Sequence, residues 1–169
     1  MVSDLPERKA PRPVHPPLVH APIGAIVAAA AFDVISAAGG GTHPWARDLF
    51  RAGTFVLMVG TVFMFAAVIT GVVDRARGTM PSSHTRRQVN RHAAVMSALI
   101  VLCVLEIVLR WGSYADAQSS PVAIVALGLL ALALAAIGGE LGGRLVYRSG
   151  VGVQAPPAEP APPSYKSVA

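Results

Sequence analysis

Charged residues and cysteine are both scarce in this chain of 169 residues. Only 14% of its residues are Asp, Glu, Lys or Arg, whereas soluble domains average about 25%. So low a share, combined with long apolar runs, argues against an ordinary soluble domain and predicts an integral membrane protein. The single cysteine, Cys103, excludes an intrachain disulfide and excludes a CxxC or iron–sulfur site within this chain.

The motifs of common enzymes are missing as well. The sequence contains no Gly-rich phosphate loop, no HExxH motif and no Ser/His/Asp constellation, so we do not expect an enzyme. A formal net charge of +5 is compatible with nucleic-acid binding, but such binding needs a basic patch on a soluble element that fits a groove. Here the basic residues lie between apolar runs. We therefore expect no nucleic-acid partner.

What the chain does have is apolar length, with 53% hydrophobic residues and a mean hydropathy of +0.55. A helix of about 20 apolar residues, rising about 1.5 Å per residue, crosses the hydrocarbon core of a bilayer. We predict an all-α fold, a four-helix transmembrane bundle over residues 18–149. Its spans are residues 18–38, 52–73, 92–111 and 121–147. The basic, Pro-rich residues 1–17 and the Pro/Ala-rich residues 150–169 are predicted to be disordered tails.

Local signals predict where the helices begin and end. Pro22 suits the first position of a helix, which places His20 just outside the first span. The Gly-rich residues 39–44 end that span and turn the chain. Near the end of the middle loop, Thr85 and Gln88 have the spacing of a capping box and predict the start of the third helix.

Basic residues are distributed unevenly between the two sides of such a bundle. One side, with the two tails and the middle loop, holds 11 of the 14 basic residues: Arg8, Lys9, Arg12, Arg75, Arg77, Arg86, Arg87, Arg91, Arg144, Arg148 and Lys166. The other side holds Arg47, Arg51 and Arg110. Positive residues favour the cytoplasmic side. Since heavy use of Ala, Gly, Val and Arg is typical of GC-rich bacteria, we expect a bacterial plasma-membrane protein with both termini cytoplasmic.

Two histidines occupy corresponding places on the first and third spans. His20 and His92 each lie near the cytoplasmic surface, on helices that run in the same direction. Two imidazoles at one depth form the ligand set of a bis-histidine haem b or a metal site. His15 and His84 are weaker candidates from the loops. The alternative is that these histidines are solvated, or bond to backbone and headgroups.

A polar stripe runs along the third span and includes Cys103, Glu106 and Arg110, which share one helical face at 100° per residue. A carboxyl group facing lipid costs a few kcal/mol, so we expect this face to point into the bundle. Asp33 of the first span lies at about the level of Glu106. Together these carboxyls predict a proton-relay or ion site. The alternative is that burial keeps them neutral, or that Arg110 or Arg51 pairs with them.

Three further features concern helix ends and packing. Glu140 and Arg144, four residues apart, are predicted to pair at the cytoplasmic end of the fourth helix, and Asp74 marks the terminus of the second. Two overlapping GxxxG spacings are formed by Gly138, Gly139, Gly142 and Gly143. Small residues let membrane helices approach closely. This face either packs within the chain or forms a homo-oligomer.

Four segments carry a resemblance to a known family. They are HPPLVHAPIG at residues 15–24, TGVVD at residues 70–74, His92 at the third span, and GGELGGRLVYRSGVGV at residues 138–153. Together they resemble a bacterial membrane family catalogued as domain of unknown function 2231. The resemblance implies a four-helix membrane domain. Because some members are fused to Rieske iron–sulfur domains, it also implies a setting of respiratory electron transfer.

From these observations we predict a non-enzymatic, redox-associated membrane subunit. It holds haem b or a metal through His20 and His92, and its partner is a Rieske-type or other respiratory-chain protein. A small transporter or proton- or ion-conducting bundle that uses Asp33 and Glu106 is one alternative. A purely structural partner subunit is the other.

Overall fold

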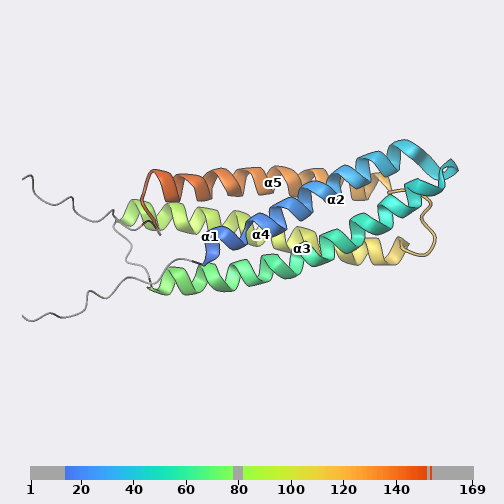
Figure 1. Cartoon of the computed structure of the whole chain (residues 1–169). Helices are drawn as coiled ribbons and strands as arrows, with labels where there is room; N and C mark the ends of the chain where they lie inside the picture. The colour runs from blue at the N-terminus through green and yellow to red at the C-terminus, as the bar shows by residue number, and fades with distance from the viewer. Residues whose placement is uncertain (1–13, 78–81, 152, 154–169) are drawn as a thin grey trace, which may run out of the picture.

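The computed structural model describes residues 14–77, 82–151 and 153, and these residues form only helices and short connections (Figure 1). The fold class is therefore as predicted. The elements, in chain order, are α1 (His15–Leu18), α2 (His20–Gly39), the 3₁₀ turn η1 (Gly40–Thr42), α3 (Pro44–Arg77), α4 (Ser83–Ser113) and α5 (Val122–Tyr147).

The long helices run alternately up and down the bundle (Figure 1). Each packs against the next along the chain, and α5 closes the arrangement against α2. One end of the bundle, where α1 and α4 begin and α3 and α5 end, is called the terminal end below. The opposite end carries the α2–α3 and α4–α5 connections and is called the hairpin end. This topology brings the two ends of the described chain to one side of the bundle.

The exterior of the bundle is apolar. In the part of the chain that the structure describes, four helical segments are long and apolar enough to cross a membrane, and between 22% and 28% of each apolar window is buried inside the protein. Large side chains such as Val62, Ile69 and Val101 point outward. An apolar surface this extensive requires lipid as its solvent. The four long helices are transmembrane helices.

The first helix begins earlier than the sequence predicted. Residues 15–17 were assigned to a disordered tail, but they form α1, with prolines in its first turn. The Oδ2 atom of Asp74, at the end of α3, accepts hydrogen bonds from the backbone N–H groups of Val14 (3.1 Å) and His15 (3.0 Å). A carboxylate on a distant helix therefore caps α1. His20 is the first residue of α2 and does not lie outside it. Residues 1–13 and 154–169 of the predicted tails lie outside the described residues.

Two other helix starts also differ from the prediction. Helix α4 is capped by Ser82, whose hydroxyl accepts a hydrogen bond from the backbone N–H of Thr85 at 3.1 Å. The predicted capping box at Thr85 is wrong because a capping hydroxyl lies three residues earlier. Helix α3 begins at Pro44, directly after the Gly-rich turn, and not at residue 52. Pro44 suits this position because the first helical N–H has no partner within the helix.

The middle of the bundle has an apolar core built from all four helices. Its buried members are Ile26, Ala29, Leu57, Met64, Leu99, Cys103, Ala131 and Ala135. Small residues allow the close approach of α2 and α3, because a Cβ atom at Gly60 would overlap the side chain of Ala25. This core separates polar residues at the terminal end from polar residues nearer the hairpin end.

Candidate functional site

Two clusters of polar side chains lie at different levels of the bundle. The first, at the terminal end, consists of His15 and His92 and is called the imidazole pair. Their ring centroids are 6.3 Å apart and their planes are inclined by 82°. The second consists of Asp33, Glu106 and Arg110 and is called the buried charge cluster. Along α4 the two clusters are roughly 20 Å apart, at about 1.5 Å of rise per residue.

Both members of the imidazole pair bond to backbone carbonyls through the same ring atom. His15 Nδ1 lies 2.7 Å from the carbonyl oxygen of Ala67 on α3, and His92 Nδ1 lies 3.0 Å from that of Gly138 on α5. A carbonyl oxygen only accepts, so each Nδ1 carries the proton. In a neutral imidazole the other nitrogen, Nε2, then has a free lone pair. Neither Nε2 atom has a hydrogen-bond partner within the described residues.

Glycines make room for both rings. A Cβ atom at Gly71 would lie 3.0 Å from His15 Nδ1, and one at Gly142 would lie 3.2 Å from His92 Cε1. Gly71 belongs to the TGVVD segment and Gly142 to the GGELGG segment. Together with the cap that Asp74 provides for α1, these contacts bring all four motif segments of the sequence to one level of the terminal end.

The other two candidate histidines lie elsewhere at this end. His20 is exposed, and its Nδ1 lies 3.1 Å from the carbonyl oxygen of Pro17 in the preceding turn. His84 is exposed near the start of α4. The structure thus places His15, one of the weaker candidates, beside His92. Among the described residues, no group of three or more His, Cys, Asp or Glu side chains is arranged to hold a metal ion.

The buried charge cluster is sealed from solvent and from lipid. Arg110 and Asp33 are 0% exposed, and Glu106 is 1% exposed. The guanidinium of Arg110 donates to Glu106 Oε1 from Nε (3.0 Å) and from Nη2 (2.7 Å), and Nη2 also donates to Asp33 Oδ2. The inward orientation predicted for the polar face of α4 is confirmed. The pairing of both carboxyls with Arg110 matches one of the alternatives left open.

Hydroxyl groups extend this cluster to the rest of the hairpin end. Ser120 Oγ donates to Asp33 Oδ1 at 2.7 Å, and the backbone N–H of Ser120 donates to Ser36 Oγ at 2.8 Å. Thr54 on α3 accepts from Arg110 Nη1 at 3.4 Å. Sequence reasoning missed these three residues because isolated hydroxyls in helices and turns carry no specific signal.

The remaining predicted polar pair and the glycines lie toward the terminal end of α5. Arg144 Nε donates to Glu140 Oε1 at 2.7 Å, and both side chains are largely exposed. The two GxxxG spacings serve different faces. Gly138 and Gly142 pack against α4, where a Cβ at Gly138 would overlap Met96, whereas no atom of the described residues would lie within 4 Å of a Cβ at Gly139 or Gly143. The inner spacing therefore serves packing within the chain.

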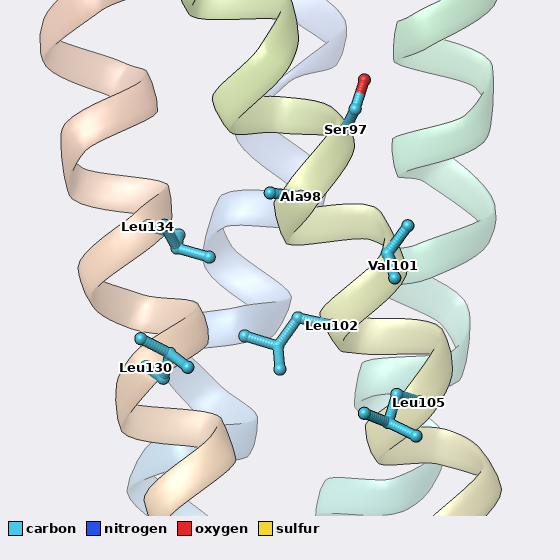
Figure 2. Close-up of a pocket in the computed structure, with 7 residues that line it drawn as sticks. All are labelled: Ser97, Ala98, Val101, Leu102, Leu105, Leu130 and Leu134. Atoms are coloured by element: carbon cyan, nitrogen blue, oxygen red, sulfur yellow. The ribbon is translucent and has the colours of Figure 1, made fainter.

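An open apolar groove of about 470 Å³ lies between α4 and α5, away from both clusters (Figure 2). Its lining residues are Ser97, Ala98, Val101, Leu102, Leu105, Leu130 and Leu134. Figure 2 shows Leu102 of α4 and Leu134 of α5 directed toward the space between the two helices. None of these residues is ionisable, so the groove offers contact for hydrocarbon and no acid–base or ligand chemistry.

In the described residues, four apolar helices that enclose Asp33, Glu106 and Arg110 define a polytopic integral membrane protein. Comparison with known families identifies the family. The sequence pattern of the family described as "Predicted membrane protein (DUF2231)" matches residues 11–155, and the chain belongs to this family. The resemblance drawn from the four motif segments is therefore confirmed. No curated protein and no solved structure matches the chain.

Proposed function

We propose that this membrane protein is a non-enzymatic subunit that binds a haem iron, or another transition metal ion, through His15 and His92. The observation that carries the proposal is the pair of hydrogen bonds from their Nδ1 atoms to backbone carbonyls. A histidine that binds a metal typically donates its other ring N–H to a carbonyl or carboxylate, which fixes the tautomer and the ring orientation. Both rings of the imidazole pair have this arrangement, with Nε2 left for a metal.

The spacing of the rings supports a single shared ion. Imidazole nitrogen binds metals at about 2.0–2.1 Å, so two imidazoles on opposite sides of one ion have ring centres about 6–6.5 Å apart. The centroids of His15 and His92 are 6.3 Å apart. The small number of ligands favours haem, because its macrocycle supplies four nitrogens and the protein needs to supply two. A zinc site would require three or four protein ligands.

The distribution of basic residues extends the proposal to the orientation of the protein in the membrane. Within the described residues, the terminal end carries Arg75, Arg77, Arg86, Arg87, Arg91, Arg144 and Arg148. The hairpin end carries fewer basic groups at its surface, Arg47 and Arg51, and both are half-buried. By the positive-inside rule the terminal end faces the cytoplasm of a bacterium, so the bound centre lies near the inner surface of the plasma membrane. A Rieske-type or other respiratory-chain protein is the proposed partner for electron transfer.

A proton- or ion-conducting bundle receives less support. The side chains between the buried charge cluster and the imidazole pair are mainly those of the apolar core, such as Leu57 and Met64. The buried hydroxyl of Thr61 also lies at this depth of α3, but it donates to the carbonyl of Leu57 in its own helix. A relay needs polar groups or water along its path, and an apolar layer provides neither. A pH-gradient assay in liposomes tests this alternative. Proton flux that the wild type shows and Asp33→Asn abolishes would favour a proton-conducting bundle over a bound redox centre.

Haem titration of the purified protein in detergent tests the proposal. We expect a red-shifted Soret band with one haem bound per chain, and loss of at least nine-tenths of the affinity in His15→Ala and in His92→Ala. His20→Ala and His84→Ala are the matched controls, because both histidines are exposed at the same end of the bundle. The controls are expected to bind haem as the wild type does. Circular dichroism confirms that each variant is folded.

Two results contradict the proposed site. The first is the absence of any Soret shift in the wild type, together with no bound copper or iron by elemental analysis. The second is equal loss of binding in the control variants, which would indicate nonspecific haem uptake by detergent-exposed histidines.

A further inference from the structure

The buried charge cluster contains more acidic than basic groups. Asp33 and Glu106 face the single guanidinium of Arg110, and all three side chains are at most 1% exposed. With both carboxyls ionised, the cluster would hold one uncompensated negative charge at membrane depth. Enclosing an unpaired charge is far more costly than enclosing a neutral acid, so such groups take up a proton instead.

The hydrogen bonds distinguish the two carboxyl groups. Both oxygens of Asp33 are occupied, since Oδ1 accepts from Ser120 Oγ at 2.7 Å and Oδ2 accepts from Arg110 Nη2. In Glu106, Oε1 accepts two hydrogen bonds from Arg110, whereas Oε2 is buried and has no partner among the described residues. An ionised carboxylate with one oxygen left unsolvated is the less stable of the two. A proton on that oxygen removes the charge.

We propose that Glu106 Oε2 carries a proton, so that the cluster is a proton-binding site in which Asp33 is the ionised partner of Arg110. The cluster is then electrically neutral. The proposal does not depend on the imidazole pair, which lies at the other end of the bundle.

Among the described groups around the site, Asp33 is the competing base, and both of its oxygens already accept hydrogen bonds. Helix α2 contributes Asp33 and Ser36, α3 contributes Thr54, and the connection before α5 contributes Ser120. Helix α4 contributes Cys103, one turn before Glu106, and Arg110. From α5 the backbone at Gly128 approaches closely, because a Cβ there would lie 3.6 Å from Asp33 Oδ2 and 3.7 Å from Glu106 Oε1. Release of the proton would leave the cluster negative, so it requires a cation or a rearrangement of the hairpin end.

Infrared spectroscopy of the full chain in lipid nanodiscs tests this assignment at neutral pH. A protonated carboxyl gives a C=O stretching band that an ionised carboxylate lacks. We expect such a band in the wild type, a downward shift of it on labelling glutamate side-chain carboxyls with ¹³C, and no shift on labelling aspartate. Glu106→Gln is expected to abolish the band. Glu140→Gln is the matched control, since Glu140 is exposed and also lies four residues from its arginine.

Three outcomes overturn the proposal. The first is that the wild type shows no protonated-carboxyl band. The second is that the band shifts with the aspartate label, which would place the proton on Asp33. The third is that the band persists in Glu106→Gln. Isotope labelling uses the unaltered protein, so it distinguishes a protonated glutamate from a protonated aspartate even where Glu106→Gln does not fold. Persistence of the band in Glu140→Gln then excludes the other glutamate of the described residues.

Discussion

Replacing Arg110 by methionine removes the guanidinium from the buried charge cluster and is expected to destabilise the bundle. The side chain donates four hydrogen bonds: two to Glu106, one to Asp33 and one to Thr54. Hydrogen bonds between helices in membranes contribute on average about 0.6 kcal/mol each, which sets a lower estimate of about 2 kcal/mol. Removing one partner of a buried ion pair costs about 3–5 kcal/mol. We expect a loss of about 2–4 kcal/mol, because the abandoned Asp33 carboxylate relieves part of the penalty by taking up a proton.

The assay is reversible unfolding in mixed micelles with increasing sodium dodecyl sulfate, followed by circular dichroism. Arg144→Met is the matched control, since Arg144 forms an exposed pair with Glu140 and its loss should change the unfolding free energy by less than about 0.5 kcal/mol. Adding Asp33→Asn and Glu106→Gln to Arg110→Met should restore at least half of the lost stability, because no carboxyl then lacks a cation. The reasoning is refuted if Arg110→Met unfolds like the wild type, or if the triple variant is less stable than Arg110→Met.

Three further predictions concern packing, capping and orientation. Gly60→Ala should destabilise the protein by about 1–3 kcal/mol in the same unfolding assay, because the added methyl overlaps α2. The control Gly24→Ala should be nearly neutral, because its methyl meets open space. Equal effects of the two substitutions would contradict the close contact between α2 and α3. Asp74→Ala should destabilise the start of α1 by about 1 kcal/mol and weaken haem affinity severalfold; unchanged affinity would show that the cap does not position the ligand. The orientation is tested with single cysteines introduced by Gln118→Cys or Arg87→Cys in a Cys103→Ser background. A membrane-impermeant maleimide should label the Gln118→Cys variant from outside intact cells and the Arg87→Cys variant only after lysis. The reverse pattern would contradict the proposed orientation.

The sequence was sufficient to predict the membrane-spanning parts of the helices but not their full lengths. Apolar runs define the segments that lipid solvates, and apart from residues 18, 19 and 121 these lie within α2 to α5. Hydropathy did not detect the first two turns of α3, because they contain Arg47 and Arg51. These turns are helical since the polar side chains have partners at the interface: Arg47 donates to the carbonyl of Ala115, and Arg51 lies 5.1 Å from the ring of Tyr114.

The polar face of α4 shows a similar limit. Helical periodicity placed Glu106 and Arg110 on one face, and the cost of exposing them to lipid directed that face inward. Which cation pairs with Asp33 depends on how α2 and α4 are rotated in the bundle. That rotation is set by packing between residues distant in sequence, so the sequence alone leaves Arg110 and Arg51 as alternatives.

The partner of His92 was the hardest feature to predict. His15 precedes two prolines, a pattern typical of an extended tail and also of the first turn of a helix. Asp74 stabilises the helical conformation from 59 residues away, and no local signal reports a cap of that kind. The prolines at the start of α1 were the one available indication that His15 belongs to the bundle.

The central claim is that His15 and His92 hold their protons on Nδ1 and present bare Nε2 atoms to a metal. Nitrogen-15 NMR of the metal-free protein, labelled at histidine, measures the tautomer of each ring directly. The account predicts that both residues are in the Nδ1–H form, with assignments confirmed by the loss of one signal each in His15→Ala and His92→Ala. Signals showing that either ring is protonated at Nε2 would contradict it.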